Sequence, residues 1–339
     1  MKTEIYDVAS QEYKEKWNEF VKKNEGSIYQ LWEWKDIFQK TYKYKPRYFV
    51  ADKSGTIQGI FPMFSLGMFG GKRLSSIPFT DFAGPLVTQE ELAKELIQKS
   101  LESIEEKISI EIFTEKKYSL LEKSLYIDAP FCYFILKTTR PFKEIITGTI
   151  HQKTRNMINK AEKMGIKILQ KNAKEGLKDY YNLYWQTMIK LLSLPHHEDF
   201  FQNVSIFLHD KSKIFFAEYD GQYVAALWTF IWNGTLYIWG NASNKKALSI
   251  GANNALYAFV IKYACESSNI NEVNFGSTVR ETPHHFFKKR FGGQEKPIYR
   301  IGNKKLFSPS SIQKKTMKVL RYIPRPLLKK LAKIIYEIY

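Results

Sequence analysis

Two stretches of the chain alternate apolar and polar positions in the same way. In residues 47–64, and again in residues 213–230, an apolar strand-like run leads into a short turn and a second apolar run. The turns carry Ser54-Gly55 in the first stretch and Asp220-Gly221 in the second. Such alternation on both sides of a turn with glycine predicts a β-hairpin in each stretch.

The pattern after each hairpin is repeated as well. Both hairpins are followed by a strand, by a helix with apolar positions three and four residues apart, and by a further strand. We expect these elements at residues 72–79, 89–107 and 108–114 in the first half and at residues 235–243, 252–267 and 271–276 in the second. The same order of four elements, found twice, indicates an internal duplication.

A basic segment joins the two halves. It predicts a short helix that ends at Gly165, a strand over residues 166–170 and a long helix over residues 174–192. We therefore place the domain boundary near Ile150. The expected division is a first subdomain over residues 1–150, a second over residues 151–305 and a tail over residues 306–339. Strands and helices that alternate in this way favour an α/β (α+β) fold.

Composition narrows the class of protein. The 339 residues are 44% apolar and 15% aromatic, which is typical of a globular chain with one large or two ordinary domains. Cys132 and Cys265 have no histidine or cysteine at ligand spacing, so we expect neither a metal site nor a disulfide framework. The charged N-terminus has no signal-peptide core, and no apolar run reaches the ~18 residues of a spanning helix. These features favour a cytoplasmic protein.

The positive charge is concentrated at the C-terminal end. The chain has 52 lysines and arginines against 34 acidic residues, a net charge of +18. Residues 304–339 hold ten of these cations and one acidic residue, Glu337, so the segment carries 10 − 1 = +9. Such a charge indicates an anionic partner: a phospholipid leaflet, a nucleic acid or a polyphosphate substrate.

The same segment has the pattern of a basic amphipathic helix. Lys329, Lys330 and Lys333 lie among apolar residues at near-helical spacing, which are Leu327, Leu328, Leu331, Ile334, Ile335 and Ile338. Residues 308–339 would then make peripheral contact with an anionic bilayer on the inner face of the membrane. A terminal helix that docks on the body of the protein has the same pattern, and the sequence leaves both alternatives open.

A strand, a loop and a helix follow one another over residues 239–259. A loop that leads into a helix presents unpaired backbone N–H groups, which suit a phosphate group. The residues expected to bind it are Lys245, Lys246, Ser249, Gly251 and Asn253. The loop has one glycine where a glycine-rich phosphate loop has two or three, so an ordinary capped helix is the alternative.

The segment "NFGSTVRETPHHFFKKRFGG", residues 274–293, holds the densest group of polar residues. A strand ends at its first residues, and Pro283 suits the first turn of a helix. Because ligands of open sheets bind at strand ends, we expect Asn274, Ser277 and Arg280 to line a cleft, with Lys288 on the helix that follows. The run of three cations from Lys288 would ordinarily be a solvated face. The aromatic residues on both sides indicate that at least one cation points inward.

Two pairs of histidines offer general bases or metal ligands. They are His196-His197 and His284-His285. Neither pair has the spacing of a zinc-binding helix or of a nucleophilic triad. We interpret both pairs as structural.

The same segment resembles a known family. The strand end "NFGS" and the later "FFKKRFG" are similar to the patterns D/N-F-G-S and F-K-x-x-W/F-G of the Fem-type aminoacyl transferases and related FemAB-like proteins, which belong to the GNAT superfamily. The stretch "TRNMINKAEKMGIKI" resembles the basic helix and strand that precede this domain in the family. The resemblance extends over roughly residues 27–301.

The resemblance implies two tandem GNAT-like subdomains, each a mixed, mostly antiparallel sheet flanked by helices. It also implies an acyl- or aminoacyltransferase that forms an amide on an amine of a cell-envelope precursor or polysaccharide. The donor would be acyl-CoA or an aminoacyl-tRNA, used as co-substrate without a tightly bound cofactor. The acceptor would be an anionic small molecule or a lipid-linked one.

The resemblance further implies roles for single residues. Lys288 matches the family lysine that handles the activated acyl donor, and Ser277 and Asn274 match the strand-end positions. Asn274 stands where aspartate is common, which removes a carboxylate. Asp81, just before the Gly84-Pro85 pair, is the residue we expect in the corresponding segment of the first half.

The expected chemistry is acyl transfer to a primary amine. Lys288 would neutralise the oxyanion or the donor's phosphates, and the two arginines Arg155 and Arg280 would hold an anionic acceptor. Lys246 and Gly251 would bind substrate in the loop described above. We thus expect Lys288, Ser277 and Asn274 at the catalytic centre, without a metal.

Two other functions stay open. An acyl-CoA-dependent GNAT N-acetyltransferase is one, although residues 249–253 lack the Arg/Gln-x-x-Gly-x-Gly/Ala pattern of CoA-binding loops. A non-catalytic nucleic-acid-binding protein, related to tRNA, is the other. It would use the charge and the aromatic residues, but the sequence has no helix-turn-helix, zinc or RNP-like motif.

Overall fold

Both hairpins expected from the sequence are present. β2 (Lys45–Lys53) pairs antiparallel with β3 (Thr56–Leu66), and β9 (Ser212–Tyr219) with β10 (Gln222–Trp232). The two residues of each turn have positive φ: 55° and 82° in the first turn and 55° and 68° in the second. Positive φ at both positions is the geometry of a type I′ turn, which glycine permits and which matches the twist of the strands.

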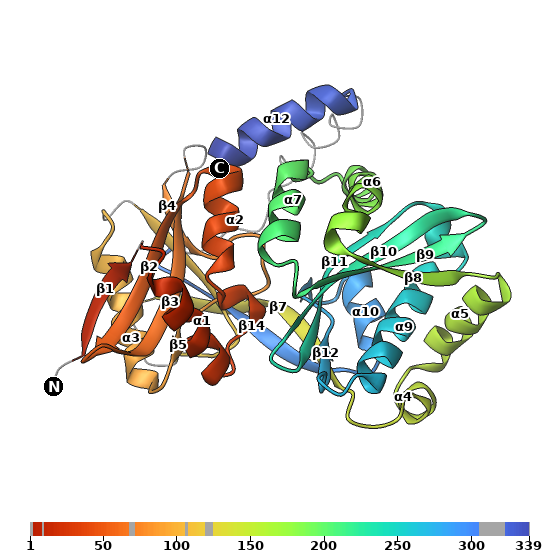
Figure 1. Cartoon of the computed structure of the whole chain (residues 1–339), viewed down its shortest axis with the longest axis horizontal. Coiled ribbons are helices and arrows are strands. Elements are labelled where there is room, and N and C mark those ends of the chain that lie inside the picture. The colour runs from red at the N-terminus through yellow and green to blue at the C-terminus, as the bar shows by residue number, and fades with distance from the viewer. Residues whose placement is uncertain are drawn as a thin grey trace. The chain divides into compact units, whose positions relative to one another are not determined.

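The computed structural model describes residues 3–8, 10–67, 72–105, 108–118, 125–304 and 323–338. The chain divides into two compact units. Unit 1 consists of Met1–Phe131, Pro297–Ser308 and Lys333–Tyr339, and unit 2 of Cys132–Lys296 and Pro309–Ala332. The chain passes from one unit to the other within three elements, which are β7 (Tyr126–Lys137), β14 (Gln294–Gly302) and α12 (Arg325–Ile338). Figure 1 labels the elements along the chain.

Unit 1 is a mixed sheet with helices on both faces. Its strands lie in the order β1-β2-β3-β4-β6-β14, and β5 pairs with β3. Besides the hairpin and β14, the elements of this unit are β1 (Glu4–Val8), β4 (Arg73–Ser76), β5 (Leu86–Val87), β6 (Ser109–Thr114), α1 (Tyr13–Lys23), the 3₁₀ helix η1 (Ile28–Gln30), α2 (Glu33–Tyr42) and α3 (Glu90–Glu102). All strand pairs are antiparallel except β4 with β6, which the crossover helix α3 connects in parallel.

Unit 2 repeats this plan. Its strands lie in the order β7-β12-β11-β10-β9-β8, and β11 and β12 form the parallel pair. Besides β7 and the hairpin, its elements are β8 (Lys167–Asn172), β11 (Thr235–Ser243), β12 (Glu272–Asn274), β13 (Thr278–Val279), α4 (Phe142–Gly148), α5 (Gln152–Lys163), α6 (Ala173–Leu191), α7 (Glu198–Phe207), α8 (Lys246–Ser249), α9 (Ala252–Glu266) and α10 (Pro283–Lys289). The duplicated order is therefore a strand, two helices, a hairpin, a strand, a crossover helix and a parallel strand.

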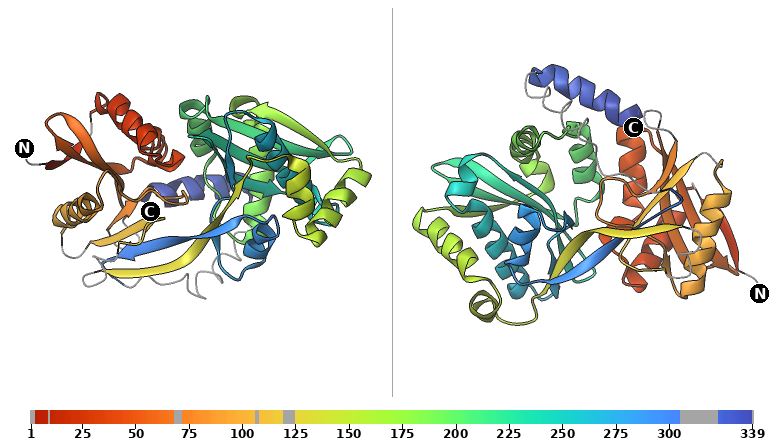
Figure 2. Two further views of the ribbon diagram at one scale, coloured as in Figure 1. Left: turned by 90° about the horizontal axis from the view of Figure 1, so that it is seen from below. Right: turned by 180° about the vertical axis from the view of Figure 1, so that it is seen from behind.

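Each sheet packs differently on its two faces, and successive strand residues contribute to opposite faces. In unit 1, α3 covers a mainly aliphatic core that includes Leu74, Leu96 and Ile110, while the ring of Trp17 of α1 lies 4.9 Å from that of Tyr48 on the other face. Figure 2 (left) shows α3 and the pair α1–α2 on opposite sides of this sheet. The apolar spacing that predicted the helix over residues 89–107 is the buried face of α3.

Unit 2 is built in the same way. α9 covers a mainly aliphatic core that includes Leu227, Leu236 and Val273, and α5 packs on α9. On the opposite face, Tyr180 of α6 lies 5.1 Å and Phe201 of α7 lies 5.9 Å from Trp228. Figure 1 shows α6 and α7 on one side of this sheet and α9 with α5 on the other.

Each half of the chain contributes its last strand to the sheet of the other unit. β7 follows β6 in the chain, but its residues Ile135 to Lys137 pair with β12 of unit 2. β14 comes from the second half, but its residues Tyr299 to Gly302 pair with β6 of unit 1. The division therefore lies inside these long strands and earlier than Ile150, where we expected the boundary. A strand that continues from one unit into the next carries no turn or linker that would mark the change.

The tail expected over residues 306–339 is described only from residue 323 onward. There it forms the helix α12. None of the described helices combines the length and the apolarity that crossing a bilayer requires.

Candidate active site

The parallel strands β11 and β12 separate after a short pairing. Thr235 to Tyr237 of β11 pair with Glu272 to Asn274 of β12, and β11 then continues to Ser243. Against β10, Trp228 pairs with Gly240 and Thr229 with Ile238, so Trp239 forms a β-bulge in β11. A bulge bends and twists its strand, and ligands of open sheets bind at the carboxyl ends of strands. A ligand site is therefore expected at the carboxyl ends of β11 and β12.

Side-chain hydrogen bonds stabilise the turn after β12. The side-chain Oδ1 of Asn274 accepts a hydrogen bond from the N–H of Gly276 at 2.8 Å, and Gly276 has a φ of 75°. The Nζ of Lys288 donates to the carbonyl oxygens of Gly276 at 2.9 Å and of Ser277 at 2.8 Å. The structure thus brings together the three residues that we expected at the catalytic centre: Asn274, Ser277 and Lys288.

Lys288 is the cation of its run that points inward. Its side chain is 3% exposed, while Lys289 and Arg290 are exposed. Pro283 begins α10, and the hydroxyl of Thr282 caps the helix by accepting a hydrogen bond from the N–H of His285 at 3.3 Å. The helix therefore fixes Lys288 beneath the strand-end turn. In this position its ammonium orders the backbone of residues 276–277.

An ionic cluster lies beside this turn. Arg280 donates to Oε1 of Glu295 at 2.8 Å, and Nε2 of His285 lies 3.1 Å from Oε2 of the same carboxylate. The hydrogen bond from Arg280, together with that from His285, lowers the pKa of Glu295. Burial, assisted by the charge of Glu295, raises the pKa of Cys132 to about 11, so its thiol is protonated at neutral pH.

Cys132, His285 and Glu295 form a group that the sequence analysis did not bring together. Their ligand atoms lie within 4.8 Å of one another, which makes them a possible donor set for a metal ion. The Nδ1 of His285 is buried without a hydrogen-bond partner. Since the three residues come from β7, α10 and β14, no local spacing in the sequence could have revealed the group.

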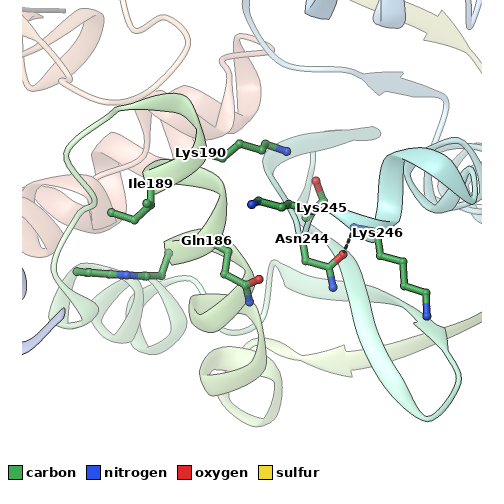
Figure 3. Close-up of a pocket in the computed structure, with 8 residues that line it drawn as sticks. Gln186, Ile189, Lys190, Asn244, Lys245 and Lys246 are labelled. Carbon is green, nitrogen blue, oxygen red and sulfur yellow. Dashed lines mark hydrogen bonds between the residues drawn. The ribbon is translucent and has the colours of Figure 1, made fainter. Parts of the chain in front are cut away.

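A basic pocket opens beside the carboxyl end of β11. It has a volume of about 690 Å³ and is lined by Trp185, Gln186, Ile189, Lys190, Ser243, Asn244, Lys245 and Lys246. Its walls are α6 and the loop between β11 and α8, and none of these lining residues is acidic. Lys190 and Lys245 extend into the space between these two elements, as Figure 3 shows. We call this the lysine pocket.

The loop of the lysine pocket is ordered by its own side chains. Oδ1 of Asn244 accepts hydrogen bonds from the N–H groups of Lys246 at 3.0 Å and of Ala247 at 3.1 Å. The ammonium of Lys246, the residue that we expected to bind substrate, lies 4.3 Å from the ring centre of Tyr219 and points away from α6. Lys190 comes from a remote helix and was not among the expected residues.

Three other expected residues have structural partners. Gly251 has a φ of 76°, and a Cβ at this position would lie 2.5 Å from the carbonyl oxygen of Met157, so the close approach of α5 to α9 requires glycine. Arg155 of α5 donates to the carbonyl oxygens of Thr147 and Ile150 at the end of α4. In unit 1, Asp81 accepts a hydrogen bond from the hydroxyl of Tyr29 at 3.0 Å.

Comparison with known families identifies the central part of unit 2. Residues 150–288 match the acetyltransferase (GNAT) domain family. This part of the chain, less than half of its length, is therefore similar to a GNAT domain. The match extends from Ile150, two residues before α5, to Lys288 in α10, and so contains the β11–β12 pair, the strand-end turn and the lysine pocket. Cys132 and Glu295 lie outside it.

Solved structures share the fold over most of the chain. FemX is 14% identical, with a TM-score of 0.65 over 88% of this chain and 96% of its own. The C-terminal domain of a protein assigned as a lysylphosphatidylglycerol synthetase from Agrobacterium fabrum is 11% identical, with a TM-score of 0.60 over 92% of this chain and 96% of its own. A tandem GNAT protein from the clavulanic acid biosynthesis pathway is 8% identical, with a TM-score of 0.57 over 91% of this chain and 100% of its own.

These similarities confirm the expected fold of two tandem GNAT-like units. At such low identity they show the fold and not the substrates. A comparison with curated protein sequences gave no significant match.

Proposed function

We propose that the protein transfers an acyl or aminoacyl group to an amine of a cell-envelope precursor or polysaccharide, and that the lysine pocket of the GNAT domain binds an anionic substrate of this reaction. The observation that carries the proposal is the placement of Lys190 and Lys245 on facing walls of a pocket at the carboxyl end of β11. Two ammonium groups without an acidic residue among the lining side chains favour a ligand with several negative charges.

The donor would be acyl-CoA or an aminoacyl-tRNA, both of which carry phosphate groups. The GNAT domain supports the first, because acyl-CoA is the usual co-substrate of this fold. The similarity to FemX and to the lysylphosphatidylglycerol synthetase supports transfer of an aminoacyl group at the cell envelope. A basic chain with a net charge of +18 fits either donor and an anionic or lipid-linked acceptor.

The strand-end turn would serve the chemical step. An attacking amine must lose a proton, and the oxyanion of the tetrahedral intermediate needs a hydrogen-bond donor, commonly a backbone N–H at a strand end. Lys288 would fix the backbone of Gly276 and Ser277 through its two hydrogen bonds and thereby preorganise this region. We assign it a positioning role in the reaction.

The test is a transfer assay with each donor class in turn. Labelled acyl-CoA and labelled aminoacyl-tRNA are incubated with an amino-sugar nucleotide and with a lipid-linked amine, and the amide product is identified by mass spectrometry. We expect one donor class to give product. In the double variant Lys190→Glu, Lys245→Glu, the KM for the anionic substrate should rise at least about tenfold, because two attractive charges become repulsive.

Lys178→Glu is the matched control. Lys178 is exposed on α6, the helix that carries Lys190, and does not line the pocket. Its KM should stay close to that of the unaltered protein. Absence of product with both donors would overturn the proposal. Tight, salt-dependent tRNA binding without product would do so in favour of a nucleic-acid-binding protein.

A further inference from the structure

The helix α12 turns an apolar face outward. Its buried positions are Leu328 and Ala332, each 1% exposed. Next to them along the same apolar side of the helix, four large apolar side chains are exposed, by 58%, 37%, 53% and 37%, which are Leu327, Leu331, Ile334 and Ile335. These residues recur at intervals of four, three and one, so they form one stripe. We call it the outer stripe.

Polar and aromatic contacts hold the opposite side of α12. In unit 2, Nζ of Lys329 donates to Oε2 of Glu198 at 2.8 Å, and the guanidinium of Arg325 lies 5.1 Å from the ring centre of Trp185. In unit 1, the ring of Tyr336 lies 5.5 Å from that of Tyr42. A surface helix of a globular protein ordinarily buries its apolar stripe and exposes its charges. In α12 much of the apolar surface stays outside, although the helix is docked.

Positive charge borders the outer stripe at Lys330. Lys330 is exposed and lies one helical turn from both Leu327 and Ile334. Residues 304–339 carry ten cations and a single acidic residue. An apolar stripe flanked by lysines is complementary to the interface of an anionic bilayer, where the stripe enters the acyl boundary and the cations meet the phosphates.

We propose that the outer stripe of α12 binds the surface of an anionic phospholipid bilayer while the part of the helix that carries Leu328 and Ala332 stays docked on the protein. The two alternatives that the sequence left open, docking and membrane contact, are then properties of different parts of one helix. The sequence pattern alone could not separate them, because it does not show which apolar residues the body of the protein covers.

The contacts of α12 link this surface to the candidate site. Trp185, on which Arg325 stacks, lines the lysine pocket, and Asn182 of the same helix α6 accepts a hydrogen bond from Arg325 at 2.9 Å. A bilayer bound to the outer stripe would therefore be close to the helix that carries Lys190. This link rests on the proposed function, and it favours a lipid-linked acceptor over a soluble one.

The test is vesicle flotation of the full chain. Vesicles of phosphatidylcholine alone are compared with vesicles that contain about one third phosphatidylglycerol. The variant Leu331→Glu, Ile334→Glu places two charges in the outer stripe and leaves Leu328 and Ala332 in place. The control, Leu169→Glu, Ile206→Glu, makes the same change at two exposed apolar side chains of unit 2 outside α12.

We expect the unaltered protein and the control to float with anionic vesicles at least tenfold more strongly than with neutral ones, and the α12 variant to lose at least tenfold of this binding. Thermal melting should show that both variants are folded. Equal flotation of the α12 variant and the unaltered protein would overturn the proposal. A second result would also overturn it: the unaltered protein does not bind vesicles but forms a dimer, and the α12 variant is a monomer. The outer stripe would then be covered by a second copy of the chain.

The membrane proposal and the transfer proposal fail separately. The variant Lys190→Glu, Lys245→Glu should still float while losing transfer. The α12 variant should keep its transfer rate on a soluble acceptor in the absence of vesicles. Loss of flotation in the lysine-pocket variant would count against the outer stripe as the main contact.

Discussion

The side chain of Lys288 is almost fully buried. The stability lost when its ammonium is removed therefore depends on the two carbonyl oxygens to which it donates. Replacement by methionine keeps most of the unbranched side chain but leaves the oxygens of Gly276 and Ser277 without this donor. A buried polar group that loses a charged partner costs about 1–3 kcal/mol. We expect Lys288→Met to lower the free energy of unfolding by about 2–3 kcal/mol, and the exposed neighbour Lys289→Met to change it by less than about 0.5 kcal/mol. Urea denaturation measures both.

The same pair of variants tests the positioning role. If Lys288 preorganises the turn for the chemical step, its loss should lower kcat by about 10²-fold, the usual effect of disturbing an oxyanion site, and change KM little. Lys289→Met should keep the activity of the unaltered protein. Similar turnover in the two variants, measured at a temperature where both are folded, would contradict the assignment.

Single residues were predictable only where neighbours in the sequence constrain them. Lys288 could be expected to point inward because aromatic residues flank it within the same short helix. Lys190 and Glu295 could not be found in this way, because Lys190 meets Lys245 across two elements that are far apart in the sequence and Glu295 meets Cys132 and His285 only in the folded sheet. Lys246 was expected to bind substrate, and it lines the lysine pocket, although its ammonium lies over the ring of Tyr219.

At the scale of elements, α5 packs closely on α9 because residue 251 is a glycine, which has no Cβ. The start of α9 comes so close to α5 that a Cβ at Gly251 would lie 2.5 Å from the carbonyl oxygen of Met157. Gly221, in the turn of the second hairpin, has a similar positive φ of 68° but nothing within 4 Å of a Cβ. The two glycines therefore separate the cost of the backbone conformation from the cost of the overlap.

We expect Gly221→Ala to lower the free energy of unfolding by about 1–2 kcal/mol, the cost of a left-handed conformation. Gly251→Ala should cost about 1–3 kcal/mol more, because the helices must also move apart. Because α9 follows the loop of the lysine pocket, the second variant should raise the KM for the anionic substrate as well. Equal melting temperatures of the two variants would show that α5 moves away from α9 without any loss of stability.

Elements with a strong local signal agreed with the structure. The type I′ turns, the apolar stripe of α3 and the proline at the start of α10 each act within a few residues, so the sequence predicts them directly. The role of Gly251 could not be predicted in this way. The sequence left a phosphate loop and an ordinary capped helix open at this position, and neither alternative reveals the close approach to the carbonyl oxygen of Met157.

At the scale of the whole molecule, the two halves of the duplication exchange their last strands. β7 completes the sheet of unit 2 and β14 that of unit 1. The repeated order of elements was visible in the sequence because each hairpin and helix is a local pattern. The exchange was not visible, since a strand carries no local mark of which partner it pairs with. For this reason the boundary was expected near Ile150.

The exchange predicts which fragments fold. The core of unit 2 includes five side chains from the segment between the two candidate boundaries, which are Cys132, Phe134, Leu136, Ile145 and Ile150. Burial of a large apolar side chain contributes about 1.5–3 kcal/mol, while the net stability of a domain is only about 5–15 kcal/mol. Loss of this segment should therefore remove most or all of the stability of unit 2.

We expect a fragment of residues 132–296 to unfold in a cooperative thermal transition and a fragment of residues 151–296 to show none, as followed by near-ultraviolet circular dichroism. The second fragment also leaves β12 without its antiparallel partner, so it should aggregate at a lower concentration. Adding back a peptide of residues 126–150 should restore the transition, because it supplies both the strand and the core side chains. A cooperative transition of the 151–296 fragment by itself would mean that β7 is dispensable to unit 2, and that the duplicated halves are complete without the exchange.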